Sequence, residues 1–158
     1  MSTPKHTPEQ VAIAVADALE RDHVAIIKTW YERTQEDAEL ASIPISFEKR
    51  TFYLHRLIQD LVIRLRLPVD ALPIASATAV EHGKYRATQG YTGPMLVEES
   101  RILQVTIFES LKESLSREDS GSVLKSVMTI ADEVDSQLKQ MLKAYLDAAK
   151  KDTSLRVA

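Results

Sequence analysis

Apolar residues recur every three or four positions along most of this chain, which is the spacing of one face of an α-helix. The segment from residue 47 to 66 shows the pattern most clearly, with apolar or small residues at Phe47, Thr51, Leu54, Ile58, Leu61 and Leu65. The same periodicity extends from Val11 to Ala149, and only short polar or proline-containing stretches interrupt it. The pattern predicts an all-α bundle of five to seven helices.

Capping residues, prolines and glycines predict where these helices begin and end. Thr7 and Gln10 form a potential capping box around Pro8, which suits the first helical position. Asp22 leaves open whether the first helix is continuous. We expect residues 38–46 to form a loop ending in a Ser46 cap. Further helices are expected at about 47–66, 72–89, 94–116 and 122–150, with Asp70 as a cap and Gly90 as a left-handed helix end.

The apolar stripes also predict which side chains form the core. We expect these residues to be buried: Trp30, Leu54, Ile58, Leu61, Ile102, Leu103, Phe108 and Leu111. The arginines of the 47–66 segment are expected to face elsewhere, and they are Arg50, Arg56, Arg64 and Arg66.

The last predicted helix is the longest and carries two apolar stripes. A heptad seam comprises Leu124, Val127, Ala131, Val134, Leu138, Met141, Tyr145 and Ala148. A second stripe comprises Val123, Ile130, Leu142, Leu146 and Ala149. One stripe is enough to cover the bundle, so the other would leave apolar surface in water unless a second chain covers it. We therefore expect a parallel homodimer in which this helix passes the signal, with either stripe facing the partner.

Composition agrees with a single globular domain. The chain has 158 residues, of which 44% are hydrophobic and 27% charged, and it contains only four glycines and six prolines. This length is sufficient for one hydrophobic core, and the chain has too few turn-forming residues for a sandwich or barrel of short strands. We expect a helical domain over residues 9–150 between a flexible N-terminus (1–8) and a flexible tail (151–158).

The charge and the cysteine content of the chain limit its possible binding partners and its cellular compartment. The net charge of −3 gives no basic excess for binding nucleic acid. The absence of cysteine fits a reducing compartment. The polar N-terminus lacks a signal-peptide core, and no apolar run has the length of a membrane span. We expect a soluble, cytoplasmic protein that binds neither nucleic acid nor membrane.

Signatures of catalysis are missing from the sequence. It has no glycine-rich phosphate loop, no Gly-x-Ser-x-Gly or His-Glu-x-x-His motif, and none of the ATP-binding boxes of a histidine kinase. We therefore expect no enzyme activity, no metal and no cofactor in this segment. Of the four histidines, His6, His23 and His55 are expected at the surface or its boundary.

The remaining histidine, His82, belongs to a polar stripe. His82, Arg86 and Gln89 fall at i, i+4 and i+7 and share one helix face. The chain then turns at Gly90-Tyr91 and continues to Glu98, Glu99 and Arg101. A helical hairpin through Gly90 would bring the two polar groups together. They would form either a hydrogen-bond network that fixes the hairpin or a pocket for a ligand or relay.

This segment resembles a known family. The run His82-Gly83, Arg86, Gln89-Gly90-Tyr91, followed by Glu99-Ser100-Arg101-Ile102-Leu103, is similar to the N-terminal sensory domain of RsbRD-type proteins, the RsbT co-antagonists of bacterial stressosomes. That domain also stands at the front of bacterial histidine kinases. The resemblance covers roughly residues 9–148. It implies a globin-like fold without haem, usually dimeric, and in a kinase the catalytic part would follow Ala158.

The same region is similar to globin-coupled sensors, in which the haem-ligating histidine lies four residues before a comparable glycine. Counting back from Gly90 places Arg86 at that position, and a guanidinium is not a normal iron ligand. His82 lies one turn earlier. We therefore expect a non-haem regulatory sensor domain, with a downstream signalling domain or regulator as partner. The alternatives are a haem- or gas-binding sensor that uses His82 and a ligand-free structural dimerisation module.

Overall fold

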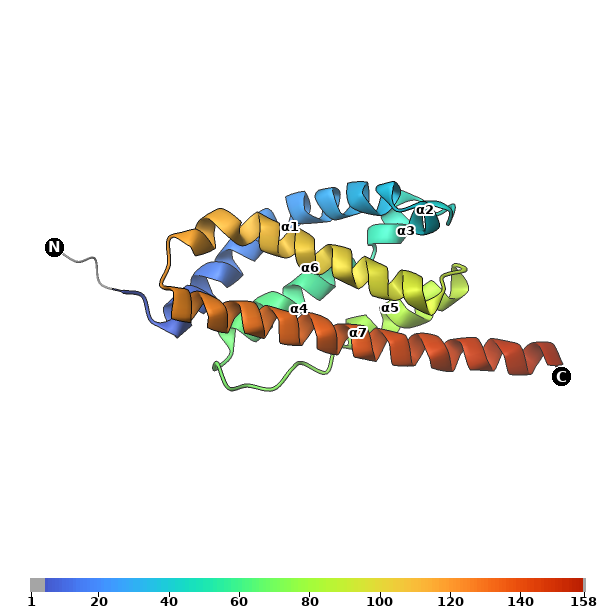
Figure 1. The fold of residues 1–158 in the computed structure, drawn as a ribbon. Helices are drawn as coiled ribbons and strands as arrows, with labels where there is room; N and C mark the ends of the chain where they lie inside the picture. The colour runs from blue at the N-terminus through green and yellow to red at the C-terminus, as the bar shows by residue number, and fades with distance from the viewer. Residues whose placement is uncertain (1–4, 158) are drawn as a thin grey trace.

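A computed structural model describes residues 5–157 of the chain, and in this range it contains helices and no strand. The helical elements are α1 (Pro8–Glu36), α2 (Ala38–Ala41), α3 (Phe47–Thr51), α4 (Leu54–Arg66), α5 (Ala77–Thr88), α6 (Gly93–Ser116) and α7 (Ser120–Val157). The predicted all-α bundle with a long C-terminal helix is confirmed (Figure 1).

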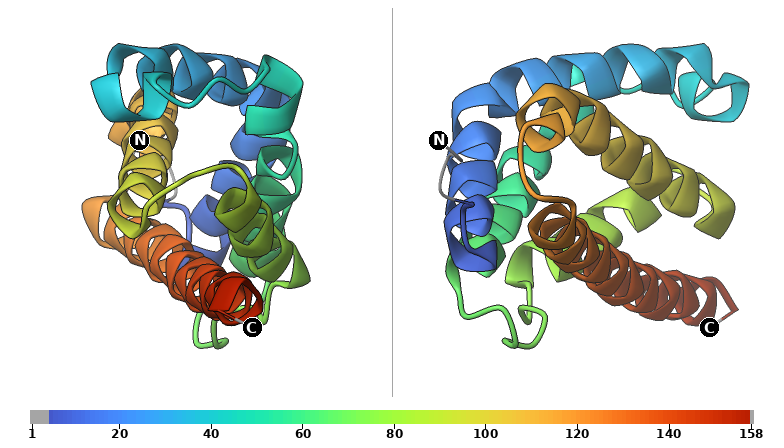
Figure 2. Two further views of the ribbon diagram at one scale, coloured as in Figure 1. Left: turned by 90° about the vertical axis from the view of Figure 1, so that its right-hand side faces the viewer. Right: turned by 60° about the vertical axis from the view of Figure 1, so that its left-hand side comes forward.

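The long helix α7 is central to the arrangement, because it packs against α1, α4, α5 and α6. Helix α1 in turn packs against α4 and α6, so these helices surround a common core (Figure 2). The last turns of α7 extend past the turn between α5 and α6 and end away from the rest of the bundle (Figure 1). In the described part of the chain, no helix is both long enough and apolar enough to cross a membrane.

Several helix boundaries differ from the predictions. Helix α1 is continuous through Asp22, and the predicted loop 38–46 contains the short helix α2, capped by Asp37. The predicted 47–66 helix breaks at Phe52 and Tyr53 into α3 and α4. Both residues keep right-handed helical dihedral angles, so the apolar spacing continues through the break and the sequence pattern does not reveal it.

The connection between α4 and α5 is longer than predicted. Helix α5 begins at Ala77, and its cap is Ser76, whose hydroxyl accepts from the Ala79 amide at 3.0 Å. The prediction of Asp70 as the cap was therefore wrong. Residues 67–76 are held instead by α7, because the side chain of Gln140 accepts from the Ser76 amide and donates to the Ile74 carbonyl. These are long-range contacts, which local capping rules do not register.

The chain ends show one confirmed cap and one longer helix. Thr7 caps α1 through a capping box with Gln10, as predicted. Of the predicted flexible N-terminus, residues 1–4 lie outside the described range, whereas Lys5 pairs with Asp119 at 3.3 Å. Helix α7 continues to Val157 instead of ending near residue 150.

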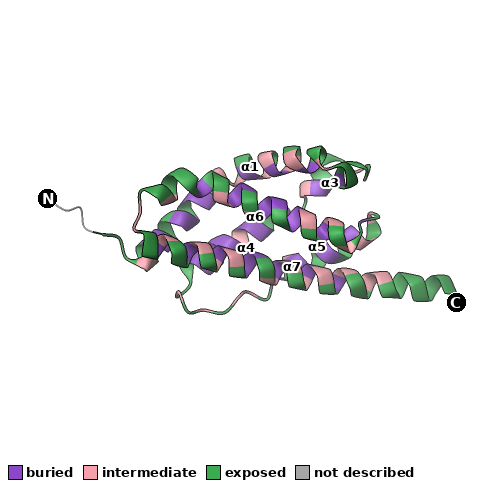
Figure 3. Cartoon of the chain, in the orientation of Figure 1, coloured by how far each residue is buried: buried purple, intermediate pink, exposed green. Residues whose placement is uncertain are grey.

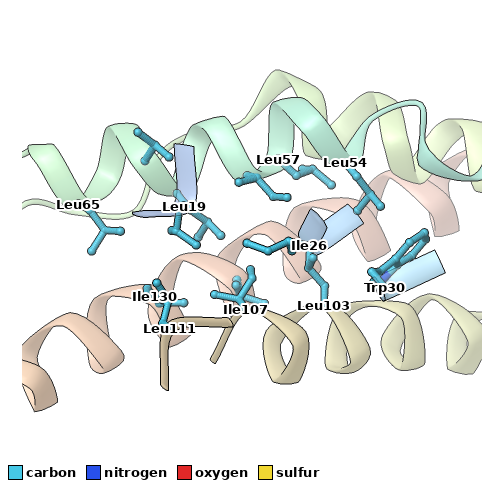
Figure 4. Close-up of a cluster of buried hydrophobic side chains, with 14 of the residues drawn as sticks. Leu19, Ile26, Trp30, Leu54, Leu57, Leu65, Leu103, Ile107, Leu111 and Ile130 are labelled. Atoms are coloured by element: carbon cyan, nitrogen blue, oxygen red, sulfur yellow. The ribbon is translucent and has the colours of Figure 1, made fainter. Parts of the chain in front are cut away.

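Seven of the eight predicted core side chains are buried, and Phe108 is only partly covered. Trp30 from α1, Leu54 from α4 and Leu103 from α6 meet in the centre of the bundle, with Ile107 and Ile130 farther along (Figure 4). Phe108 lies next to Ile107 on α6, on the side that faces the groove toward α7. The apolar spacing of α6 covers more of the helix than the core needs, which explains the error.

Neither predicted stripe of α7 coincides with its buried face. The buried residues are Ser122, Ser126, Ile130, Glu133, Val134, Gln137, Met141 and Ala144. This face shares Val134 and Met141 with the seam and Ile130 with the second stripe, and it also contains polar residues that a search for apolar periodicity passes over. Most of the heptad seam is only partly buried, and its first residue, Leu124, is 58% exposed. The last turns of α7 are exposed all round (Figure 3).

Candidate functional site

Five polar side chains from three helices and a turn meet inside the bundle. They are Arg50 of α3, His82 and Arg86 of α5, Tyr91 of the following turn and Glu99 of α6, and each is at most 3% exposed. We call this group the Glu99 cluster. The sequence predicted that a hairpin through Gly90 would bring the stripe of His82, Arg86 and Gln89 near the group around Glu99, and the structure places His82 and Arg86 beside Glu99. Gly90 makes the turn with φ +83°, a left-handed conformation that favours glycine.

The carboxylate of Glu99 lies at the centre of the cluster. Its Oε2 accepts from the Nε of Arg86 at 3.0 Å, and its Oε1 accepts from the Tyr91 hydroxyl at 2.6 Å. The Nε2 of His82 is 3.6 Å from Oε2, and Nη1 of Arg50 is 3.8 Å from Oε1. The backbone carbonyl of Glu99 also accepts from the indole nitrogen of Trp30 at 3.1 Å. Glu99 therefore joins α6 to α1 and to α5.

Arg86 is the main partner of this carboxylate. Besides Glu99, its guanidinium donates to the side-chain oxygen of Gln89 at 2.7 Å and to the backbone carbonyl of Arg50 at 2.6 Å. The same group lies over the ring of Tyr91, with its central carbon 4.5 Å from the ring centroid. Three hydrogen bonds in different directions together with a stacked contact suit arginine and not lysine, because they use the flat, forked shape of the guanidinium.

Arg50 is a member of the cluster that the sequence analysis missed. It donates to the Tyr91 hydroxyl at 2.5 Å and to the backbone carbonyls of Leu40 and Ile43 at 2.9 and 3.0 Å. The prediction that Arg50 faces away from the core was therefore wrong. The sequence spacing did indicate that Arg50 is buried, since Arg50 lies one turn before Leu54 and shares its face.

Burial and charge set the protonation states of the cluster. Burial lowers the pKa of His82, and the positive charge of Arg86 lowers it further, against the contact with Glu99. Burial by itself would raise the pKa of Glu99, but Arg86, His82 and Tyr91 together hold it below the ordinary value. Burial and the negative charge of Glu99 raise the pKa of Tyr91. At neutral pH the cluster contains an ionised carboxylate, two guanidinium groups, a neutral imidazole and a protonated phenol.

Two residues of the predicted site lie outside this core. Arg101 is exposed and pairs with Glu98 at 2.7 Å, on the outer side of α6. Gln89 is partly buried at the end of α5 and contacts the cluster through Arg86. Arg101 shares the sequence motif with Glu99, but two positions along a helix turn a side chain to a different face.

One contact connects the cluster to the long helix. The hydroxyl of Tyr145, a residue of the predicted seam on α7, donates to the backbone carbonyl of Tyr91 at 2.6 Å. The side chain of Tyr91 in turn donates to Glu99. Tyr91 therefore links the centre of the bundle to α7, through its hydroxyl on one side and its backbone carbonyl on the other.

A second polar group anchors α7 farther along, and the sequence analysis did not find it. Glu133 is fully buried, accepts from the Ile74 amide at 3.2 Å and lies 3.5 Å from the Nε of Arg64. Burial raises the pKa of Glu133, although the Ile74 amide opposes the shift. Arg64 is also buried, against the prediction that it faces away from the core. This group fixes the 67–76 connection against α4 and α7.

The space at the Glu99 cluster does not fit a haem. The cavity beside His82 has a volume of about 10 Å³, whereas small-molecule pockets typically have roughly 300–1,000 Å³. Arg86, at the position that resembles the iron ligand, is fully committed to Glu99, Gln89 and a backbone carbonyl. His82 directs Nε2 toward Glu99. Within residues 5–157, no group of three or more potential ligands is arranged to hold a metal ion.

Comparison of this chain with protein-family models, with curated proteins and with solved structures finds no match. These comparisons therefore do not identify the RsbRD-type family that the segment from His82 to Leu103 resembles. The structure adds that four residues of this motif, His82, Arg86, Tyr91 and Glu99, form one buried network.

Proposed function

We propose that this chain is a non-haem, globin-like regulatory sensor domain that acts as the input module of a bacterial histidine kinase or stressosome-type regulator. The observation that carries the proposal is helix α7. Its first two thirds are packed in the bundle and contact both buried polar groups, and its last turns project into solvent. A helix of this form can transmit a shift of the bundle to a signalling domain or regulator near its C-terminal end.

The proposed dimer would form along the side of α7 that faces α6. An apolar groove of about 500 Å³ runs between these two helices and is lined by Val105, Phe108, Leu115, Val123 and Val127, among others. Leu124 and Met128 next to it are 58% and 61% exposed. Exposed apolar surface of this kind is typical of an interaction site. A second copy packed here in parallel would bring both α7 ends together, as a dimeric output domain requires.

The first experiment measures the mass of the protein in solution by analytical ultracentrifugation at micromolar concentration. We expect a dimer, and we expect the Leu124→Glu, Met128→Glu double variant to be monomeric because it places charges in the proposed interface. The control is Val24→Glu on α1, which is 68% exposed and distant in sequence from this face. A monomeric wild type would remove the proposed signalling route, and a dimer that resists both charges would place the interface elsewhere.

A second experiment separates a sensor from a ligand-free structural dimerisation module. Spin labels at Leu155 on both copies report the distance between the α7 ends. We expect Tyr145→Phe, which removes only the hydrogen bond to the Tyr91 carbonyl, to change this distance distribution while the dimer persists. The control is Tyr31→Phe, a partly buried tyrosine on α1 outside the Glu99 cluster. An unchanged distribution in Tyr145→Phe would favour the structural module, since the cluster would then have no influence on α7.

A further inference from the structure

The centre of the bundle contains a small cavity whose walls are not uniformly apolar. Its volume is about 10 Å³, and every residue that lines it is buried. Most of the wall is apolar, but His82 of α5, Ser100 of α6 and Gln137 of α7 also contribute. Empty cavities in proteins are typically apolar, and a cavity with polar walls that can hold one probe sphere is large enough for one water molecule.

Two of these side chains carry buried polar atoms without a protein partner among the described residues. They are Nδ1 of His82 and Oε1 of Gln137. His82 is 3% exposed and Gln137 is 1% exposed, so bulk water does not reach either atom. Leaving a buried polar atom without a hydrogen bond is destabilising, so two such atoms beside one cavity indicate a bound molecule.

The hydrogen bonds around the cavity show that both atoms are acceptors. The amide nitrogen of Gln137 donates to the Leu57 carbonyl at 3.0 Å, so the amide oxygen must be the atom left over. The Nε2 of His82 lies 3.6 Å from a carboxylate oxygen of Glu99, where a lone pair would be repelled. Nε2 therefore carries the proton of the neutral ring, and Nδ1 presents a lone pair.

We infer that this cavity is a binding site for one water molecule that donates hydrogen bonds to His82 Nδ1 and Gln137 Oε1. A guest that satisfies two acceptors must have two donor hydrogens, which water has and dioxygen, nitric oxide and carbon monoxide lack. The hydroxyl of Ser100 lines the same space and is the third group available to the water oxygen. Through Gln137 and the Leu57 carbonyl, the water joins α5, α7 and α4.

The test reads the water and the imidazole directly, by nuclear magnetic resonance on the full chain. We expect the ¹⁵N shifts of His82 to report the Nε2–H tautomer with a hydrogen-bonded Nδ1. We also expect cross-relaxation between a long-lived water and the methyl groups of Leu103 and Met141, both on the cavity wall. Gln137→Met should abolish this cross-relaxation. Gln140→Met should keep it, because Gln140 lies on the same helix but does not line the cavity.

Ser100→Ala provides a milder variant of the same site, and we expect it to retain the Nε2–H tautomer while shortening the lifetime of the bound water. The opposite tautomer, with Nδ1–H bonded directly to Gln137 Oε1 and no long-lived water, would overturn the inference. So would cross-relaxation that persists in Gln137→Met. Neither the His82 shifts nor the water cross-relaxation depends on dimerisation. The water site can therefore be disproved while the proposed sensor function stands, and the sensor function can be disproved while the water site stands.

Discussion

The residue whose charge matters most to this fold is Glu99, because among residues 5–157 it is the one carboxylate that faces two buried guanidinium groups. Removing one member of a buried ion pair leaves its partner uncompensated and costs about 3–5 kcal/mol. We expect Glu99→Gln to lower the free energy of unfolding by about that amount in urea denaturation. The matched control is Glu98→Gln, whose partner Arg101 is exposed, and its cost should stay below about 1 kcal/mol. Equal losses for the two variants would show that the cluster is not the main electrostatic support of the bundle.

Histidine 82 predicts a pH dependence whose sign follows from its lowered pKa. Below the ordinary histidine pKa of about 6.5, His82 is protonated in the unfolded chain but stays neutral in the folded protein, because burial lowers its pKa. The free energy of unfolding therefore falls as the pH falls. The groups that face His82, Glu99 and Arg86, keep their charges in this window. Between pH 7.5 and 5.5 we expect the wild type to lose about 1 kcal/mol more than His82→Gln. Identical pH profiles would show that His82 takes up a proton in the folded protein as readily as in the unfolded chain.

Among the helices, the contact of α5 with α7 is the closest. A Cβ atom added at Gly83 would lie 2.1 Å from the backbone carbonyl oxygen of Met141, so an alanine forces the helices apart. We expect Gly83→Ala to lower the free energy of unfolding by about 3 kcal/mol, the upper part of the usual cost of overpacking. Gly93→Ala is the control, because its Cβ would meet only the Leu142 side chain at 3.7 Å. The free energy of unfolding of both variants is measured by chemical denaturation. A Gly83→Ala protein as stable as the wild type would contradict this packing.

The elements also show where local sequence rules fail. Thr7 and Ser46 cap the helices that the sequence predicted for them, because a cap depends on residues within one turn. The start of α5 was misplaced because Glu133 and Gln140, more than fifty residues away, hold residues 74–76 in a non-helical conformation. The break between α3 and α4 has no capping side chain at all.

For the whole molecule, packing around His82 determines whether a haem can be accommodated. The helices close on a cavity of about 10 Å³, which leaves no room for a porphyrin. We expect the purified protein to be colourless and to show no Soret band after addition of haem, measured by visible absorbance titration. The comparison variant is Arg86→His, which restores a histidine at the position that resembles the ligand site. A stoichiometric haem complex of the wild type that His82→Ala abolishes would contradict this expectation.

What the sequence determined by itself is the class of fold, most of the core and part of the polar site. Helical periodicity and capping are local properties, so Trp30, Leu54 and Leu103 could be assigned to the core from spacing alone. The polar stripe of His82 and Arg86 also follows from helical spacing, and Gly90 was recognisable as a left-handed turn. These features depend on residues that are close together along the chain.

Tertiary structure alone decided which polar residues are buried and which side of α7 faces the bundle. Arg50 was predicted to face away from the core and Glu133 was not singled out, yet both are buried because the folded chain brings partners from distant elements to them. The buried face of α7 contains Glu133 and Gln137 because the groups they bond are already inside. An apolar pattern finds the surfaces that avoid water, but a buried hydrogen bond depends on its partner, and the partner is set by the fold.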